Sequence, residues 1–209
     1  MERFPRTATN IIAAITALAW VIAAVLGQSD QAAYLLGFIP LRVEFPAAVH
    51  GAVPVFLTPL TATLVHAGLV HLGFNLLILL WCGTQVERII GAGPVVTLYL
   101  IGAYAAAFAQ WAVHPHASVP VVGASGAISA IMGAFALSYG RARAFTSDLA
   151  LNRWINVIWL MAAWVVLQLM MGWLGNQQGY LLATPAHVGG FAAGLLLQRP
   201  LLLWRFRKA

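Results

Sequence analysis

Long apolar stretches separated by short polar clusters dominate the pattern along this chain. No Asp, Glu, Lys or Arg occurs in residues 45–86, 89–140 or 154–198. A single membrane crossing needs about 20 apolar residues, so each stretch holds more than one crossing, or a crossing and a loop. Polar and turn residues divide the chain into six predicted spanning helices. They cover about residues 11–27, 70–87, 95–113, 125–140, 154–173 and 184–203.

Composition supports an all-α membrane protein. Of the 209 residues, 62% are hydrophobic and 8% charged, whereas a soluble domain has about 25% charged residues. A soluble enzyme, a disulfide scaffold and a disordered tail are therefore excluded, and the single cysteine, Cys82, has no partner for an internal disulfide. We expect one six-helix domain over residues 1–209. A signal peptide is the alternative for the first helix, which follows Arg3 and Arg6, but its apolar segment is longer than a usual signal core.

The segment between the first two predicted helices, residues 28–67, is rich in proline and in short hydrophobic patches. It also carries Asp30, Arg42 and Glu44. This segment is too apolar to extend freely into water. We therefore expect part of it, residues 47–57, to lie in the membrane interface.

The formal net charge of +6 is explained by topology. With six crossings both termini lie on one side, and all basic residues except Arg42 fall on that side. The positive-inside rule makes this side the cytoplasm. The basic residues do not form the clustered exposed face that nucleic acid needs, so no nucleic-acid partner is expected.

A few polar side chains lie at a common depth within the predicted helices. Counted from the basic residues at about 1.5 Å per residue, His71, Asn75, Ser125 and His187 lie about 18 to 26 Å above the cytoplasmic boundary. In a hydrocarbon core about 30 Å thick, this places them in the outer part of the membrane. Polar groups at this depth are costly and indicate function. His66 lies close by in the sequence.

This combination predicts nucleophilic catalysis. Ser125 is the candidate nucleophile and His187 the candidate base, because a serine hydroxyl needs a base to take its proton. His71 and Asn75 share a helix face and are candidate donors to a developing oxyanion. None of the five acidic residues lies at this depth, so the spans offer a Ser-His dyad and no acidic third member.

Glycines fit such a site. Gly123 and Gly126 flank Ser125 where a helix is predicted to begin, which permits a sharp backbone turn. Gly190 and Gly194 follow His187 at the spacing that lets two membrane helices approach closely. We expect contact with the fourth helix to bring His187 to Ser125. That helix has small residues at matching spacing: Gly126, Ala130 and Ala134.

Other interpretations exist for each element. A serine beside glycines at a helix start is often only a cap. His66, His71 and His187 could be metal ligands, but no Cys or carboxylate joins them at this depth, so no metal is expected. A small transporter is a further alternative, although its usual internal repeat is not seen.

At these residues the sequence resembles the rhomboid intramembrane serine proteases. Residues 66–75 match that family's pattern of two histidines followed by an asparagine, and residues 123–126 match its GxSG motif. Residues 186–190 with Gly194 are similar to its AHxxG segment, and Glu87 matches a recurrent glutamate. The three motifs occur in the family's order and spacing from the second to the sixth predicted helix.

The resemblance implies an intramembrane serine endopeptidase without metal or cofactor. Ser125 would be the nucleophile and His187 the general base. His71, Asn75 and the Ser125 amide would be the oxyanion donors, His66 a support for the external loop, and Gly123 and Gly126 supporting residues. Its partners would be transmembrane protein substrates and membrane lipid. Its location would be a prokaryotic cell (inner) membrane, with both termini cytoplasmic.

Two positions depart from the family pattern. Leu57-Thr58 stands where the family often has Trp-Arg, and Ser129 stands where an aromatic residue often stacks on the histidine. The second change leaves His187 with less orientation from that neighbour. Both changes bear on efficiency and substrate range more than on the reaction itself. A rhomboid-like pseudoprotease that binds membrane proteins without cutting them is a separate alternative, and the presence of both dyad residues argues against it.

Overall fold

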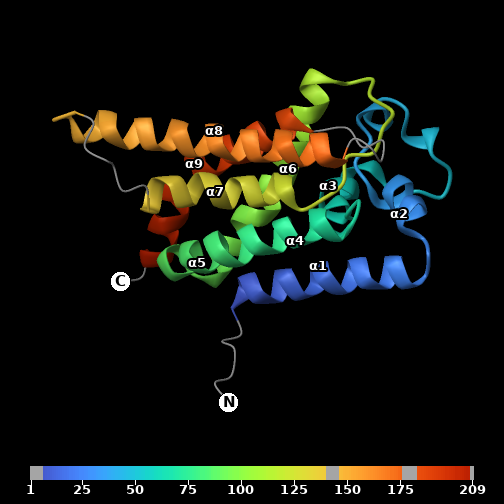
Figure 1. The fold of residues 1–209 in the computed structure, drawn as a ribbon, viewed down its shortest axis with the longest axis horizontal. Coiled ribbons are helices and arrows are strands. Elements are labelled where there is room, and N and C mark those ends of the chain that lie inside the picture. Colours follow the sequence, from blue (N-terminus) through green and yellow to red (C-terminus); the bar gives the residue numbers. More distant parts are fainter. Residues whose placement is uncertain (1–6, 140–145, 176–182, 208–209) are drawn as a thin grey trace, which may run out of the picture.

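The computed structural model describes residues 7–139, 146–175 and 183–207, and regular structure within these ranges is helical. Six long helical segments lie roughly side by side (Figure 1). The second segment is continuous and includes a central π-helical turn, η5. The segments are α1 Ala8–Val25, α4 Leu69–Ile78 with η5 Leu79–Gly83 and α5 Thr84–Ile90, α6 Ala92–Val113, α7 Ser125–Tyr139, α8 Leu149–Gly175 and α9 Thr184–Phe206.

Helices are present at all six predicted positions, but they differ in how well they suit a membrane crossing. Four described segments are long and apolar enough to span: Ala8–Val25, Leu69–Ile90, Ala92–Val113 and Leu149–Leu167. α7 has only 15 residues, and α9 is not among the four. The sequence pattern alone does not distinguish these two inner helices, which pack closely against each other, from the outer ones.

Helix boundaries differ from prediction where side chains cap the ends. α1 begins three residues before the predicted start because the Glu87 carboxylate accepts hydrogen bonds from the backbone N–H groups of Ala8 and Thr9, at 2.8 and 2.9 Å. α8 begins five residues early because the Asp148 carboxylate accepts from the N–H groups of the first turn. Sequence periodicity does not record such contacts.

Residues 28–67, predicted as a loop, contain short helices. α2 Ser29–Leu36 and α3 Thr58–Thr61 are α-helical. Both lie at the end of the bundle opposite the first residue of α1 and the last residue of α9 (Figure 1). Four short 3₁₀ turns complete the segment: η1 Pro40–Val43, η2 Pro46–Ala48, η3 Val55–Leu57 and η4 Ala62–Leu64. The interfacial position of residues 47–57 stays a prediction.

α6, α7 and α9 all pack against one another, and small residues allow α7 to approach the other two closely. A β-carbon on Gly190 would overlap the carbonyl oxygen of Gly126, and one on Gly194 would overlap that of Ala130. On the other face, a β-carbon on Gly126 would lie 2.6 Å from the β-carbon of Ala106. The predicted contact of Gly190 and Gly194 with the fourth helix is confirmed.

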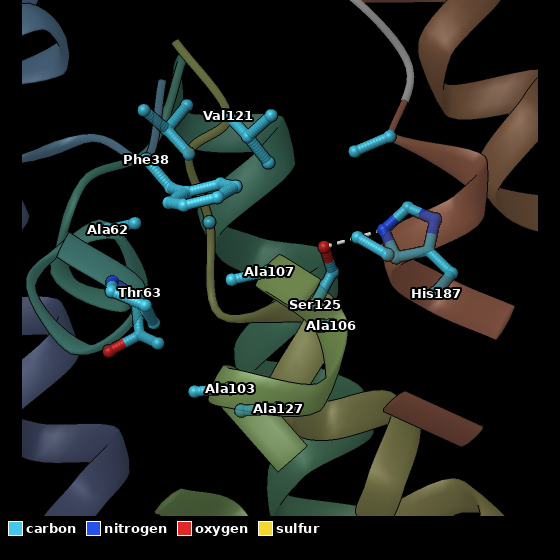
Figure 2. A pocket seen from close by; sticks show the side chains of 16 residues that line it. Phe38, Ala62, Thr63, Ala103, Ala106, Ala107, Val121, Ser125, Ala127 and His187 are labelled. Carbon is cyan, nitrogen blue, oxygen red and sulfur yellow. Dashed lines mark hydrogen bonds between the residues drawn. The ribbon is translucent and has the colours of Figure 1, made fainter. Parts of the chain in front are cut away.

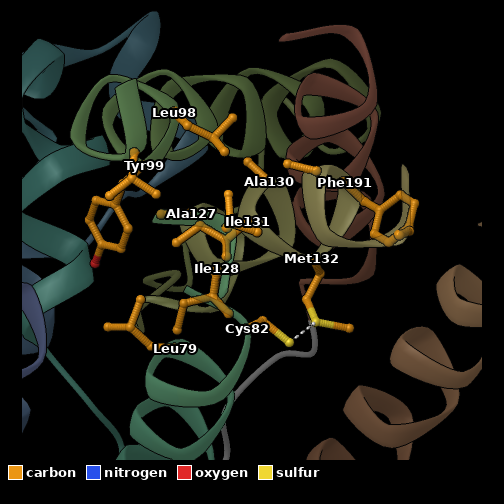
Figure 3. Close-up of a cluster of buried hydrophobic side chains, with 14 of the residues drawn as sticks. Leu79, Cys82, Leu98, Tyr99, Ala127, Ile128, Ala130, Ile131, Met132 and Phe191 are labelled. Carbon is orange, nitrogen blue, oxygen red and sulfur yellow. Dashed lines mark hydrogen bonds between the residues drawn. The ribbon is translucent and has the colours of Figure 1, made fainter. Parts of the chain in front are cut away.

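Larger side chains fill the space between α7 and the η5 turn. Leu79, Ile128 and Ile131 are fully buried there, and the Cys82 thiol lies 3.2 Å from the Met132 sulfur (Figure 3). This dense packing fixes the position of α7, whose first residue is Ser125.

Two segments between helices, residues 28–67 and 114–124, are joined next to the start of α7. Phe38 and Val121 exchange backbone hydrogen bonds of 3.0 and 2.8 Å, and the Gly123 N–H donates to the Ala62 carbonyl at 2.9 Å. The buried Arg42 side chain donates to the Val53 carbonyl at 2.8 Å and so holds the segment 28–67 together. The chain that leads into Ser125 is therefore anchored at several points.

Candidate active site

Ser125 and His187 meet at the start of two neighbouring helices. The Ser125 Oγ lies 2.8 Å from the His187 Nε2, and the two side chains point toward each other (Figure 2). Ser125 is the first residue of α7, and His187 lies in the first turn of α9. Both residues are buried, with 7% and 5% of their surface exposed. The distance is that of a hydrogen bond through which a serine can pass its proton to an imidazole.

Gly123 lets the backbone turn directly into this site. Its φ of +110° lies in the region that favours glycine. A β-carbon there would lie 2.7 Å from both Cε1 and Nε2 of His71. Glycine is therefore required at this position by conformation and by space.

The His71 ring places a nitrogen atom beside Gly123. Its Nδ1 accepts a hydrogen bond from the Ala67 N–H at 3.4 Å. The neutral ring therefore carries its proton on Nε2, the atom that lies against Gly123, two residues before Ser125. An N–H group thus points to the region beside the Ser125 hydroxyl.

Asn75 lies one helical turn beyond His71 and is buried. Its side-chain amide donates to the His71 carbonyl at 2.9 Å, which leaves its second N–H hydrogen uncommitted. Its Oδ1 is buried and has no partner among the described residues. The structure thus brings Asn75 to the helix turn of His71, and no hydrogen bond joins it to Ser125.

His66 contacts the chain just before Ser125. Its Nε2 accepts from the Ala124 N–H at 3.4 Å, and its ring centroid lies 5.0 Å from that of His71. The side chain is almost fully buried. His66 therefore contacts the segment 114–124 at its junction with α7.

Two residues near the dyad were not assigned a site role from sequence. The Trp164 indole of α8 donates through Nε1 to the Ser129 Oγ at 2.8 Å, and the Ser129 hydroxyl donates to the Ser125 carbonyl at 2.7 Å. The Trp164 ring also meets the His187 ring edge-on, at 6.4 Å between centroids. Tryptophan is frequent in membrane helices, so the sequence offered no signal that distinguished Trp164 from the other seven.

A small, partly open pocket lies next to Ser125. Its walls come from α6, α7, α9 and the segments 28–67 and 114–124 (Figure 2). Most lining side chains are small and apolar. Members of the lining include Phe38, Ala103, Ala106, Ala107, Val121 and Ala186. Such a surface suits a small apolar group held beside a nucleophile.

The site has no acidic third member among the described residues. The His187 Nδ1 is buried and has no hydrogen-bond partner in the part of the chain that the structure describes. Within the same ranges, no group of three or more His, Cys, Asp or Glu side chains is placed to hold a metal ion. The reactive groups of the described site are therefore a buried serine and a neutral histidine.

Comparisons with known proteins agree with this geometry. A family model described as the Rhomboid domain matches residues 55–204, which include Ser125, His187 and the segments around them. The chain belongs to the rhomboid family. With its apolar helices, this makes it an integral membrane protein.

Rhomboid relatives from bacteria and a plant match parts of the chain. The chain is 32% identical over 136 residues to the Rhomboid protease GlpG of Klebsiella pneumoniae, a match covering 64% of this chain and 44% of the relative. It is 40% identical over 75 residues to the Rhomboid protease GluP of Bacillus subtilis, covering 36% and 14%. RHOMBOID-like protein 4 of Arabidopsis thaliana is 30% identical over 145 residues, covering 69% and 34%. The chain thus spans less than half the length of these relatives.

Proposed function

We propose that this rhomboid protein is a serine endopeptidase that cleaves peptide bonds in or near transmembrane segments of membrane proteins. The observation that carries the proposal is the 2.8 Å contact between the Ser125 Oγ and the His187 Nε2 within a buried site. The resemblance to proteins named as rhomboid proteases supports the same reaction.

Acylation begins at the Ser125 hydroxyl. Its oxygen attacks the scissile carbonyl carbon while its proton passes to the His187 Nε2. When the C–N bond breaks, the proton moves from His187 to the leaving amine, and an acyl ester remains on Ser125. Water then attacks this ester with His187 again as the base, which releases the acid product and restores the serine.

Negative charge on the carbonyl oxygen needs donors in fixed positions. The His71 Nε2–H points to this region. The Ser125 N–H belongs to the first turn of α7, and the carbonyl four residues before it, that of Val121, accepts from Phe38 instead. Asn75, through its second amide hydrogen, is the third proposed donor, and Gly123, Gly126 and His66 hold the backbone around it.

We also propose six crossings with both termini in the cytoplasm of a prokaryotic cell membrane, where lipid surrounds the bundle. The first residue of α1 and the last residue of α9 lie toward the same end of the bundle, which supports this topology (Figure 1). The test introduces one cysteine at a time, at exposed Ser118 or exposed Ser147, beside the buried Cys82. An impermeant maleimide added to intact cells should label Ser118→Cys only, and labelling of Ser147→Cys only would reverse the orientation.

The nucleophile is tested with a serine-directed fluorophosphonate. We expect the wild type to be labelled at Ser125, and Ser125→Ala and His187→Ala to lose labelling. Ser118→Ala, which removes an exposed serine of the external turn, is the matched control and should label as the wild type does. Absence of labelling in the folded wild type would contradict the protease and favour a pseudoprotease that only binds membrane proteins.

A further inference from the structure

Among the described residues, nothing hydrogen-bonds the far side of the His187 ring. The Nδ1 is buried without a partner, so the ring is held only by the Ser125 hydroxyl and by packing. In an acid-containing triad, a carboxylate on this nitrogen fixes the ring orientation. Some other group must restrict rotation of the His187 ring.

Trp164 is the aromatic side chain that contacts His187. The two rings meet at an interplanar angle of 71°, which is the edge-to-face arrangement that aromatic pairs prefer. Trp164 is itself 5% exposed, whereas Trp159, five residues earlier on α8, is 68% exposed. Trp164 is therefore turned into the bundle at the level of the dyad.

Ser129 in turn fixes the orientation of Trp164. The indole N–H donates to the Ser129 Oγ at 2.8 Å, and the Ser129 hydroxyl donates to the carbonyl of Ser125 at 2.7 Å. One helical turn separates Ser129 from Ser125, so a short polar side chain leaves room for the indole from α8. The result is a chain of contacts from the nucleophile's backbone through Ser129 and Trp164 to His187.

From this arrangement we propose that Trp164 and Ser129 are positioning residues for the His187 base. An aromatic ring supplied by α8 takes the place of the aromatic side chain that rhomboids often carry at the position of Ser129. Trp164 is not among the residues that line the described pocket, so it acts on the base and not on the bound substrate. The inference rests on the proposed protease function.

The test measures kcat and KM separately on a transmembrane test substrate in detergent micelles. Trp164→Leu removes both contacts and should lower kcat about tenfold, with KM within about twofold of the wild type. Trp164→Phe keeps a ring but loses the N–H and should lower kcat about threefold. Ser129→Ala, which also loses the bond to the Ser125 carbonyl, should lower kcat at least as much. Trp159→Leu, on the exposed face of α8, is the matched control and should leave kcat unchanged.

A double-variant cycle tests the hydrogen bond itself. Trp164→Phe and Ser129→Ala both remove the bond between Trp164 and Ser129, and Ser129→Ala also removes the bond to the Ser125 carbonyl, so the double variant should lose no more kcat than Ser129→Ala alone. This cycle tests the proposal even if Trp164→Leu does not fold, because Trp164→Phe and Ser129→Ala are both small changes. Unchanged kcat in the cycle, multiplied losses, or a rise in KM alone would overturn the proposal. If the wild type neither cleaves the substrate nor reacts with the fluorophosphonate, the proposed protease function itself is contradicted. That result differs from an active wild type whose kcat does not depend on Trp164 and Ser129.

Discussion

The ring of His71 lies against the α-carbon of Gly123, so closely that a β-carbon would come within 2.7 Å of two ring atoms. This contact joins α4 to the chain that turns into Ser125. It also directs the His71 N–H toward the position where we expect the oxyanion. Because the fit is so close, we expect the site to tolerate no side chain at Gly123.

Gly123→Ala should lower kcat more than tenfold. The substitution forces alanine into a φ of +110° and pushes the His71 ring away from Ser125. Cleavage kinetics of the purified variant measure the effect. The matched control is Gly93→Ala in α6, where a β-carbon meets nothing within 4 Å. Equal activity of both variants would show that the turn at Gly123 tolerates a side chain.

His71→Ala should lower kcat by about 10² with little change in KM, because a donor to the transition state is lost. The fold should persist, since the only side-chain hydrogen bond of His71 among the described residues is the one that its Nδ1 accepts from the Ala67 N–H, at 3.4 Å. His116→Ala in the exposed external turn is the control. A change confined to KM would assign His71 to substrate binding instead.

Gly190→Ala should separate α9 from α7. The added β-carbon meets the Gly126 carbonyl oxygen, which belongs to the backbone and has little freedom to move. We expect a loss of about 1–3 kcal/mol in the free energy of unfolding and loss of fluorophosphonate labelling, because His187 moves with α9. Gly73→Ala, with open space around it, should change neither quantity.

Glu87→Gln should lower the free energy of unfolding by about 1–3 kcal/mol. The Glu87 carboxylate accepts from the N–H groups of Ala8 and Thr9 and from the Thr9 hydroxyl, and so caps the start of α1. Activity of the folded variant should be close to that of the wild type, because Glu87 lies at the opposite end of the second segment from His71. Glu44→Gln, in an exposed pair with His116, serves as the control for charge. An unfolding free energy equal to that of Glu44→Gln would contradict the capping role.

Much of the site follows from the sequence because its chemistry is local. Ser125, His71 and the glycines lie in short motifs whose spacing sets their helix face, and scarcity of charge shows which polar groups lie inside the membrane. The approach of His187 to Ser125 could also be predicted, because Gly190 and Gly194 match the small residues of α7.

The remaining features depend on contacts between distant segments. The Trp164 ring reaches His187 from a different helix, and an exposed tryptophan such as Trp159 lies in a similarly apolar stretch of the sequence. The early start of α1 depends on Glu87, 79 positions from Ala8. Helix periodicity carries no information on such pairs.

Cleavage by the purified protein in liposomes tests the central claim most directly. The substrate is a single-pass protein with a helix-destabilised transmembrane segment, and product masses locate the broken bond. We expect the wild type to produce one pair of fragments cut in or near that segment, and Ser125→Ala and His187→Ala to produce none. Equal cleavage by the wild type and Ser125→Ala, or no cleavage by a wild type that is folded, would contradict a Ser125–His187 protease.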